Sequence, residues 1–325
     1  MIEKLLMKYM KMIDESYVNG FMKLWMYQHY VLAYLSWELM IYDLDLSYIE
    51  RLQANVTAML KRWTGIYKTS IVSVIYRPRS KFGLGVTSLS ECFKRAQVNK
   101  ALILKGSSDP STVSVFEHQS KKEMSFVRQW KPIPEMKNLE KQMEFERKFA
   151  GQTDRKGLGA VKDRYLREHT KQQKCDLMKE ILSQRLTQEM IVEDSGKPLQ
   201  GMHTRLEDVH PFDLSWSRLI GSQNTKLIKW VLNASVNNLV TPQMRKIWGY
   251  SSSEKCSLCN KQGSLYHILS NCETALKQKR YTWRHDSVLK TLEGQIVPFL
   301  EKVNKAPVRK KVKKKPIKFV KQGER

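Results

Sequence analysis

Four side chains that can bind a metal ion lie close together in the sequence. They form the pattern C-x2-C-x7-H-x4-C and are Cys256, Cys259, His267 and Cys272. The close Cys pair fits a tight turn, Gly263 lets the chain double back, and His267 and Cys272, about a helical turn apart, complete a tetrahedron. Four protein ligands leave no position for water, so the pattern predicts one structural Zn²⁺ ion that supplies folding free energy. Chance clustering is the alternative.

The cysteine usage as a whole favours a metal over disulfide bonds. Three of the five cysteines and one of the seven histidines fall in this spacing. Cys92 and Cys175 stand alone on predicted helices, and we interpret them as packing residues. This distribution is typical of a reducing compartment.

Two acidic motifs raise the question of catalysis. Asp43 and Asp45 in "YDLD" are separated, unlike the adjacent aspartates of polymerases, and they precede a predicted helix whose N-terminus favours acids. The "RHD" triplet at 284–286 is followed by no carboxylate and lysine at nuclease-like spacing. We interpret the first motif as a loop and the second as a charged helix face, and we predict no catalytic residues.

The charge of the chain indicates a polyanionic partner. The formal net charge is +25 and the isoelectric point is about 9.8, which favours nucleic acid as the partner. The last 24 residues hold eleven Lys or Arg and one Glu, so they contribute +10. This end can contact nucleic acid, act as a nuclear localisation signal or be a disordered solubilising tail, and we favour the first two together. Its candidate phosphate contacts are Arg309, Lys310, Lys311, Lys313, Lys314 and Lys315.

Other cations are candidate phosphate contacts upstream of the tail. They are Arg77, Arg79 and Lys81 at the tip of a predicted loop, and Arg280, Arg284 and His285 after the cysteine cluster. Tyr76 and Phe82 lie close to the first group, a mixture suited to phosphate contact with base stacking. Solvated faces of Lys-rich helices are the alternative.

The first part of the chain contains one clear helix. Ser47 and Glu50 form a predicted capping box, and Gly65 ends the helix. Its apolar positions keep helical spacing at Ile49, Leu52, Val56, Met59, Leu60 and Trp63. The β-branched residues, Pro78 and glycines that follow predict a short hairpin or an extended loop before a helix beginning near Ser88.

The later segments differ in their apolar content. Long charged runs between 120 and 205 predict solvent-exposed helices, an extended arm. A core pattern then returns, with Asn224 as the N-cap of one helix and Thr241-Pro242 at the start of the next. The first of these helices is expected to bury Leu227, Ile228, Val231, Leu232 and Leu239.

Together these segments predict a mainly α protein of four parts. The parts are a helical domain over 1–125, a charged helical linker over 126–205, a helical segment with the zinc module over 206–292, and a disordered basic tail over 293–325. The N-terminus lacks the apolar block of a signal peptide. The longest apolar stretch is broken by Glu38, Asp43 and Asp45 and falls short of the roughly 18 apolar residues of a membrane span.

Several separate blocks of the sequence resemble one known family. The region "CSLCNKQGSLYHILSNCETALKQKRYTWRHDSVLKTL" is similar to the cysteine-histidine region of non-LTR retrotransposon proteins whose restriction-enzyme-like endonuclease follows the reverse transcriptase. The family's polymerase thumb and linker resemble "KLWMYQHYVLAYLSWELMIYDLDLS", "YRPRSKFGLGVTSLSECFKRAQVNKALIL" and "DLSWSRLIGSQNTKLIKWVLNASVNNLVTP". The resemblance runs across nearly the whole chain and is more specific than any single motif. It implies a helical, thumb-like N-terminal bundle.

The resemblance also implies a function and its limits. Such proteins nick a DNA target and use the freed 3′ end to prime copying of their own RNA. The adjacent Asp-Asp palm motif, the fingers and the nuclease acids after the Arg-His motif are absent here, so the two-metal site is missing. We expect a non-catalytic fragment, nuclear or in a cytoplasmic ribonucleoprotein, that binds RNA or DNA but no membrane or small-molecule substrate. The alternatives are an intact nuclease or polymerase with unrecognised acids, and a domesticated protein-interaction module.

Overall fold

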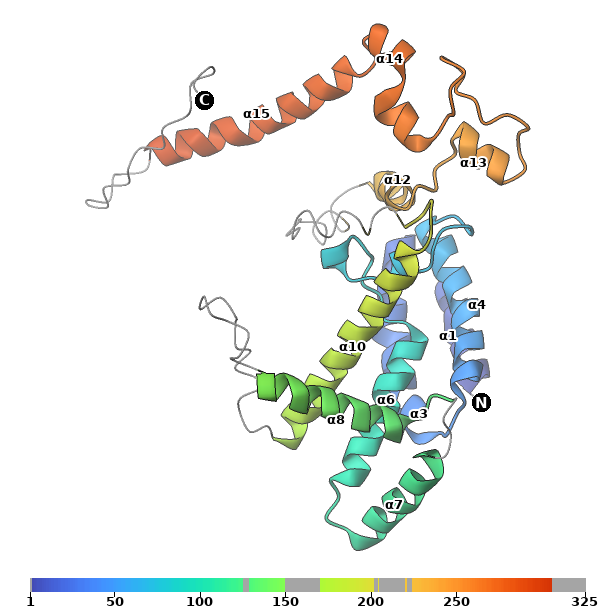
Figure 1. Ribbon diagram of the computed structural model, residues 1–325, viewed down its shortest axis with the longest axis vertical. Coiled ribbons are helices and arrows are strands. Elements are labelled where there is room, and N and C mark those ends of the chain that lie inside the picture. Colours follow the sequence, from blue (N-terminus) through green and yellow to red (C-terminus); the bar gives the residue numbers. More distant parts are fainter. Residues whose placement is uncertain are drawn as a thin grey trace. The chain divides into compact units, whose positions relative to one another are not determined.

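The protein is mainly helical, as predicted. A computed structural model describes residues 2–124, 129–149, 170–201 and 224–305, together with 204 and 220. Over these ranges the extended pairing consists of an isolated antiparallel bridge between Lys255 and Gln262. The helical elements are α1 (Ile2–Glu15), α2 (Gly20–Met26), η1 (Tyr27–Val31), α3 (Leu32–Ile41), α4 (Leu46–Thr64), α5 (Ser73–Tyr76), η2 (Arg79–Lys81), α6 (Leu89–Lys105), α7 (Pro110–Met124), α8 (Pro132–Phe149), α10 (Lys171–Ser195), α12 (Thr225–Ser235), α13 (Pro242–Ile247), η4 (His267–Asn271), α14 (Glu273–Lys277) and α15 (Thr282–Lys305) (Figure 1).

The chain divides into two compact units, Met1–Leu239 and Val240–Arg325. This division differs from the four predicted parts, since the single boundary falls inside the predicted segment 206–292. The predicted boundary at 292 lies within α15, so residues 293–305 of the predicted tail are helical. The tail residues 306–325 lie outside the described part of the chain.

The main core of the first unit surrounds α4. Five of its predicted apolar positions are buried, namely Ile49, Leu52, Val56, Leu60 and Trp63, while Met59 packs partly buried against them. Buried residues of α1, α2, η1, α3, α5, α6 and α12 belong to the same cluster. The helical spacing therefore identified the face of α4 that the other helices cover.

The two ends of α4 differ in how well the sequence predicted them. The helix begins at Leu46 with Asp45 as an extended N-cap residue, so the predicted capping box of Ser47 and Glu50 is wrong. Ser47 already lies inside the first turn. At the other end Gly65 adopts φ 68° in the left-handed region, and its N–H donates to the carbonyls of the last turn, as a C-terminal glycine does.

A contact between α1 and α4 leads to a pH-dependent prediction. Asp14 accepts hydrogen bonds from Trp63 Nε1 at 2.7 Å and from Arg62 at 2.5 Å. The bond from Trp63, followed by the charge and hydrogen bond of Arg62, lowers the pKa of Asp14 below 3.8 despite partial burial. The lowered pKa stabilises the folded state above pH 3.8. This stabilisation is lost as the pH falls through the lowered pKa, because Asp14 is then protonated in the folded as well as in the unfolded protein.

We expect Asp14→Ala to lower the free energy of unfolding by about 1 kcal/mol near neutral pH, since the carboxylate is partly exposed and screened. Urea unfolding near neutral pH and at about pH 3 would measure this difference. Asp43→Ala, in an exposed loop, is the matched control and should change little. An Asp14→Ala effect that is equally large at both pH values would contradict the assignment.

The segment between α4 and α6 is the predicted loop and contains no hairpin. It forms the short helix α5, a turn of 3-10 helix at η2, and an extended return that leads to Ser88, the N-cap of α6. The N–H groups of Leu84 and Val86 donate to carbonyls of Val74 and Ile75. These bonds to α5 replace the strand pairing that a hairpin would supply.

A second apolar cluster lies where the sequence predicted an exposed linker. Residues of α6, α7, α8 and α10 form it: Val98, Ala101, Phe116, Ile133, Met136, Leu139, Leu177, Met178, Ile181 and Leu182 are all buried. The expectation of solvent-exposed helices between 120 and 205 is therefore wrong for the faces of α8 and α10 that carry these residues. Their apolar residues are few per turn, but they gather on the faces that form this cluster, while most of the charged residues lie outside it.

Helix α12 packs into the first unit. Asn224 caps it as predicted, by accepting from the Lys226 N–H at 2.8 Å. Ile228 and Leu232 are buried in the main core, whereas Leu227 is exposed, contrary to prediction. The predicted Val231 and Leu239 are only partly buried, and Leu239 follows the end of the helix.

Buried amide groups hold α12 against the end of α4. Asn233 accepts from the Tyr67 N–H at 3.1 Å and donates to the Gly65 carbonyl at 3.1 Å. Asn238 donates to Ser70 Oγ at 2.6 Å. Such buried polar groups need these partners, so they fix the position of α12 within the unit.

None of the described helices is both long enough and apolar enough to cross a membrane.

Candidate metal centre

The first two ligands lie on a tight turn at the start of the cluster. The Cys256 N–H donates to the Lys261 carbonyl at 2.7 Å, and the Asn260 N–H donates back to the Cys256 carbonyl at 3.0 Å. Asn260 adopts φ 56°, a left-handed conformation that reverses the chain. The turn thus brings Cys256 and Cys259 to the same side of the loop.

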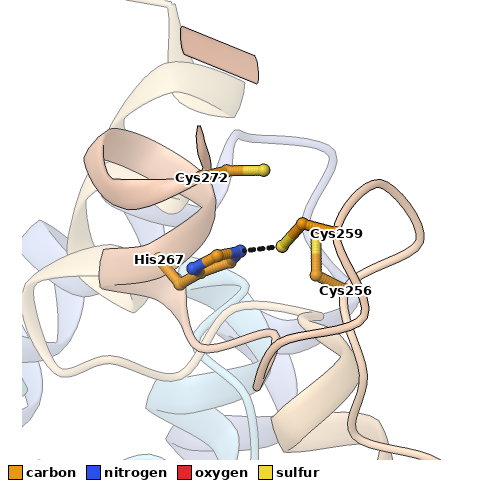
Figure 2. A group of neighbouring side chains, drawn as sticks. All are labelled: Cys256, Cys259, His267 and Cys272. Atoms are coloured by element: carbon orange, nitrogen blue, oxygen red, sulfur yellow. Dashed lines mark hydrogen bonds between the residues drawn. The ribbon is translucent and has the colours of Figure 1, made fainter. Parts of the chain in front are cut away.

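The other two ligands come from a helical segment that follows the loop. His267 begins the π-helical turn η4, and Cys272 ends it. Cys272 follows this turn in an extended conformation, and its side chain points to the same side as that of His267. Figure 2 shows the four side chains pointing toward one another, two from the loop and two from the helical segment.

The geometry of the four side chains fits a metal ion. Their ligand atoms all lie within 4.8 Å of one another, and Cys259 Sγ is 3.1 Å from His267 Nε2. In a tetrahedral zinc site with Zn–S bonds of about 2.3 Å, sulfur atoms are about 3.8 Å apart. Cys256, His267 and Cys272 are buried and Cys259 is half-buried. The predicted cluster is therefore present and can bind a metal ion.

The electrostatics of the cluster favour a cation at its centre. The N–H of Leu258, with that of Cys259, lowers the pKa of the Cys256 thiol to about 7 in spite of burial. The Lys261 N–H lowers the pKa of Cys259, but burial and the sulfur atoms of Cys272 and Cys256 outweigh it, so this pKa is raised. The polypeptide thus stabilises one thiolate and opposes a second, and a bound cation would stabilise all of them.

Little apolar packing surrounds the centre. The buried cluster there consists of Cys256, Cys272 and Ala275, with Cys259 and Tyr281 partly buried against it. Three buried residues are a small core, so a metal ion bound by the four side chains would contribute much of the local stability.

Helix α13 supports the loop from the side. Thr241 caps this helix and Pro242 is its first residue, as predicted. The Gln243 N–H donates to the Gly263 carbonyl at 3.3 Å, and a Cβ atom at Gly263 would lie 2.8 Å from Pro242. Gly263 is therefore needed for close packing against α13, rather than for the chain reversal that the sequence suggested.

Sequence reasoning missed Tyr281 as part of the centre. Its hydroxyl donates to the Ile268 carbonyl at 2.9 Å and accepts from the Cys272 N–H at 3.3 Å. These bonds hold the ligand-bearing turn to the start of α15. The sequence carries no signal for them, because a tyrosine nine residues beyond a cysteine has no fixed structural meaning.

The cations predicted next to the cluster are exposed. The Arg284 guanidinium lies over the Tyr281 ring, 5.0 Å from its centroid, and donates to the Leu269 carbonyl. Arg280 donates to Gln278 at 2.7 Å, and His285 contacts Asp286 at 3.1 Å. Arg284 is thus fixed to the metal-binding segment, whereas these side-chain contacts of Arg280 and His285 are with residues one or two positions away in the sequence.

The cations predicted in the first unit do not form one exposed tip. Arg77 is fully buried, with 0% of its surface exposed, so its predicted phosphate contact is wrong. Its carbonyl accepts from the Gly85 N–H, and a Cβ atom at Gly83 would lie 1.9 Å from the same oxygen. Arg79 is exposed and Lys81 is half-buried. The predicted tail contacts Arg309, Lys310, Lys311, Lys313, Lys314 and Lys315 lie outside the described residues.

No model of a known protein family matches the chain, and no curated protein matches it.

Proposed function

We propose that the cluster of Cys256, Cys259, His267 and Cys272 binds one structural Zn²⁺ ion. Three thiolates and an imidazole are the ligands of a closed zinc site. Backbone N–H groups lower the pKa of Cys256 to about 7, whereas the pKa of Cys259 is raised beside the other sulfur atoms, so a bound cation would be needed to stabilise all three thiolates. With four protein ligands the ion has no open position, so it would organise the polypeptide and carry out no hydrolysis.

We further propose that the chain binds RNA or DNA, as a relative of the C-terminal part of a non-LTR retrotransposon reverse transcriptase. In this proposal the first unit contains the thumb and linker used in target-primed reverse transcription. The chain lacks the palm and endonuclease active sites and has no catalytic activity by itself. It acts in the nucleus or in a cytoplasmic ribonucleoprotein.

The observation that carries this proposal is the link between the metal centre and an exposed arginine. The ligand-bearing turn holds the Tyr281 hydroxyl, and the Tyr281 ring supports the Arg284 guanidinium. A guanidinium held in place loses less conformational entropy when it binds a phosphate oxygen. The net charge of +25 supplies the attraction for the polyanion at longer range.

Salt dependence tests this proposal. We expect the logarithm of the affinity for duplex DNA to fall linearly with the logarithm of the salt concentration. The slope of this line should be about −0.9 for each phosphate contact. In Arg280→Gln/Arg284→Gln the slope should be smaller by roughly 2, since two contacts are removed. Fluorescence anisotropy with a labelled duplex at several salt concentrations would measure the slopes.

The matched control is Lys179→Gln, because Lys179 pairs with Asp176 on α10, in the other unit. It should leave the slope unchanged. Binding of the unmutated chain that does not respond to salt would refute phosphate recognition. Primer extension or nicking with added magnesium, abolished by substitution of a carboxylate, would instead support the alternative of an intact enzyme.

A further inference from the structure

An exposed row of aromatic side chains runs along α2, η1 and α3. Trp25, Tyr30, Tyr34 and Trp37 are 46% to 64% exposed. Met22 and Ile41 extend the apolar surface at its two ends. Four large rings in succession on one helical surface form a patch of the kind that marks a binding site.

The π-helical turn η1 creates this row. The Leu32 N–H donates to the Tyr27 carbonyl, an i to i+5 bond that adds one residue to the turn. In a regular α-helix, residues five apart point about 140° away from each other. Here the rings of Trp25 and Tyr30 lie 5.5 Å apart, edge to face. After Tyr30 the row continues with Tyr34 and Trp37, at the α-helical spacings of four and three residues.

Lysines of α1 lie beside the row. The rings of Tyr9 and Tyr34 are 5.1 Å apart, which joins α1 to α3 at this surface. Lys8 is exposed and precedes Tyr9 on α1, so it lies beside this contact, and the half-buried Glu38 follows Tyr34 by one turn of α3. Lys4 is exposed one turn before Lys8 on α1. The row therefore has cationic groups along one flank.

We infer that this aromatic row stacks the bases of single-stranded nucleic acid while Lys4 and Lys8 contact its phosphates. Rings stack on bases of any sequence, and neighbouring cations follow the backbone, which is the arrangement that binds single strands. The exposed lysines of α1 beside the row and the net charge of +25 favour a polyanion over a protein as the occupant. The inference rests on the proposed binding of nucleic acid, and it specifies single-stranded nucleic acid as the form that this surface binds.

The test uses the full chain and labelled oligothymidylate. In Tyr34→Leu/Trp37→Leu, leucine keeps an apolar surface but cannot stack. We expect affinity to fall by tenfold or more, on the scale of base stacking, with the salt slope unchanged. Lys4→Gln/Lys8→Gln should instead reduce the slope. Tyr17→Leu is the control, because Tyr17 is fully exposed outside the row, and circular dichroism would check the fold of each variant.

The outcomes separate this inference from the proposed function. If the unmutated chain binds neither oligothymidylate nor duplex, both are wrong. If it binds duplex and the leucine variant binds oligothymidylate as tightly as the unmutated chain does, only the stacking row is wrong. Self-association that persists in the leucine variant and excludes the oligonucleotide would assign the row to a protein contact and overturn the inference.

Discussion

Substitution of both loop ligands, Cys256→Ser/Cys259→Ser, is expected to abolish metal binding and unfold the metal-binding segment. Apparent free energies of structural zinc binding are about 10–16 kcal/mol. The three buried residues of the local core cannot replace such a contribution. Metal analysis should give about one zinc per unmutated chain and none in the variant. Hydrogen exchange should show loss of amide protection over residues 255–281.

The control for this experiment is Cys175→Ser, since Cys175 lies on α10 in the first unit. It should retain the metal. The first unit has its own apolar clusters, so we expect its helices to keep their protection in the double variant. Full metal retention by Cys256→Ser/Cys259→Ser, or a cobalt-substituted protein without a thiolate charge-transfer band, would refute the ligand assignment.

The second large effect is expected for Gly20→Ala in the first unit. Gly20 is the first residue of α2, and a Cβ atom there would lie 1.7 Å from the Trp63 carbonyl oxygen and 2.6 Å from its carbon. Both are backbone atoms at the end of α4, which cannot move without displacing the main core. Overpacking of this kind costs about 1–3 kcal/mol and occasionally more, and we expect the upper end of this range.

Gly294→Ala provides the matched control, because it is the same substitution in a different environment. Gly294 lies inside α15 and nothing would meet its Cβ atom within 4 Å. Alanine favours the helix over glycine by about 1 kcal/mol, so this variant should have a stabilised α15. Thermal unfolding of the full chain, with hydrogen exchange measured both in the core of the first unit and along α15, would compare the two variants. An unchanged stability of Gly20→Ala would show that α2 does not pack closely on α4.

The two predictions concern different units, and each depends on a separate source of stability. The first unit is stabilised by the packing of apolar side chains from helices that are distant in sequence. In the second, the proposed metal ion would provide much of the stability, because the long helix α15 leaves Val288, Leu292 and Ile296 exposed. Removal of the metal is therefore expected to affect the second unit first, and Arg284 with it, since the guanidinium depends on Tyr281 and the ligand-bearing turn. If the proposed function is correct, loss of zinc should weaken nucleic-acid binding, although the four ligands are assigned no phosphate contact.

The sequence by itself determined the features that depend on neighbouring residues. The four metal ligands lie within a single turn and a single helical segment, so their spacing was enough to predict that they meet. Gly65 and Asn224 act within one helical turn, and their roles as helix caps were correct. Local hydrogen bonds and backbone conformations decide such features, and both can be inferred from residue type and order.

The tertiary structure alone decided the features that depend on residues far apart in sequence. The charged segment that contains α8 and α10 is packed against α6, because a few apolar residues on each helix meet across the second cluster. Arg77 is buried beneath a return of the chain that the sequence described only as a loop or hairpin. The extra residue in η1 aligns Trp25 with Tyr30. In each case the burial or direction of a side chain follows from what packs against it, which the periodicity of its own segment does not specify.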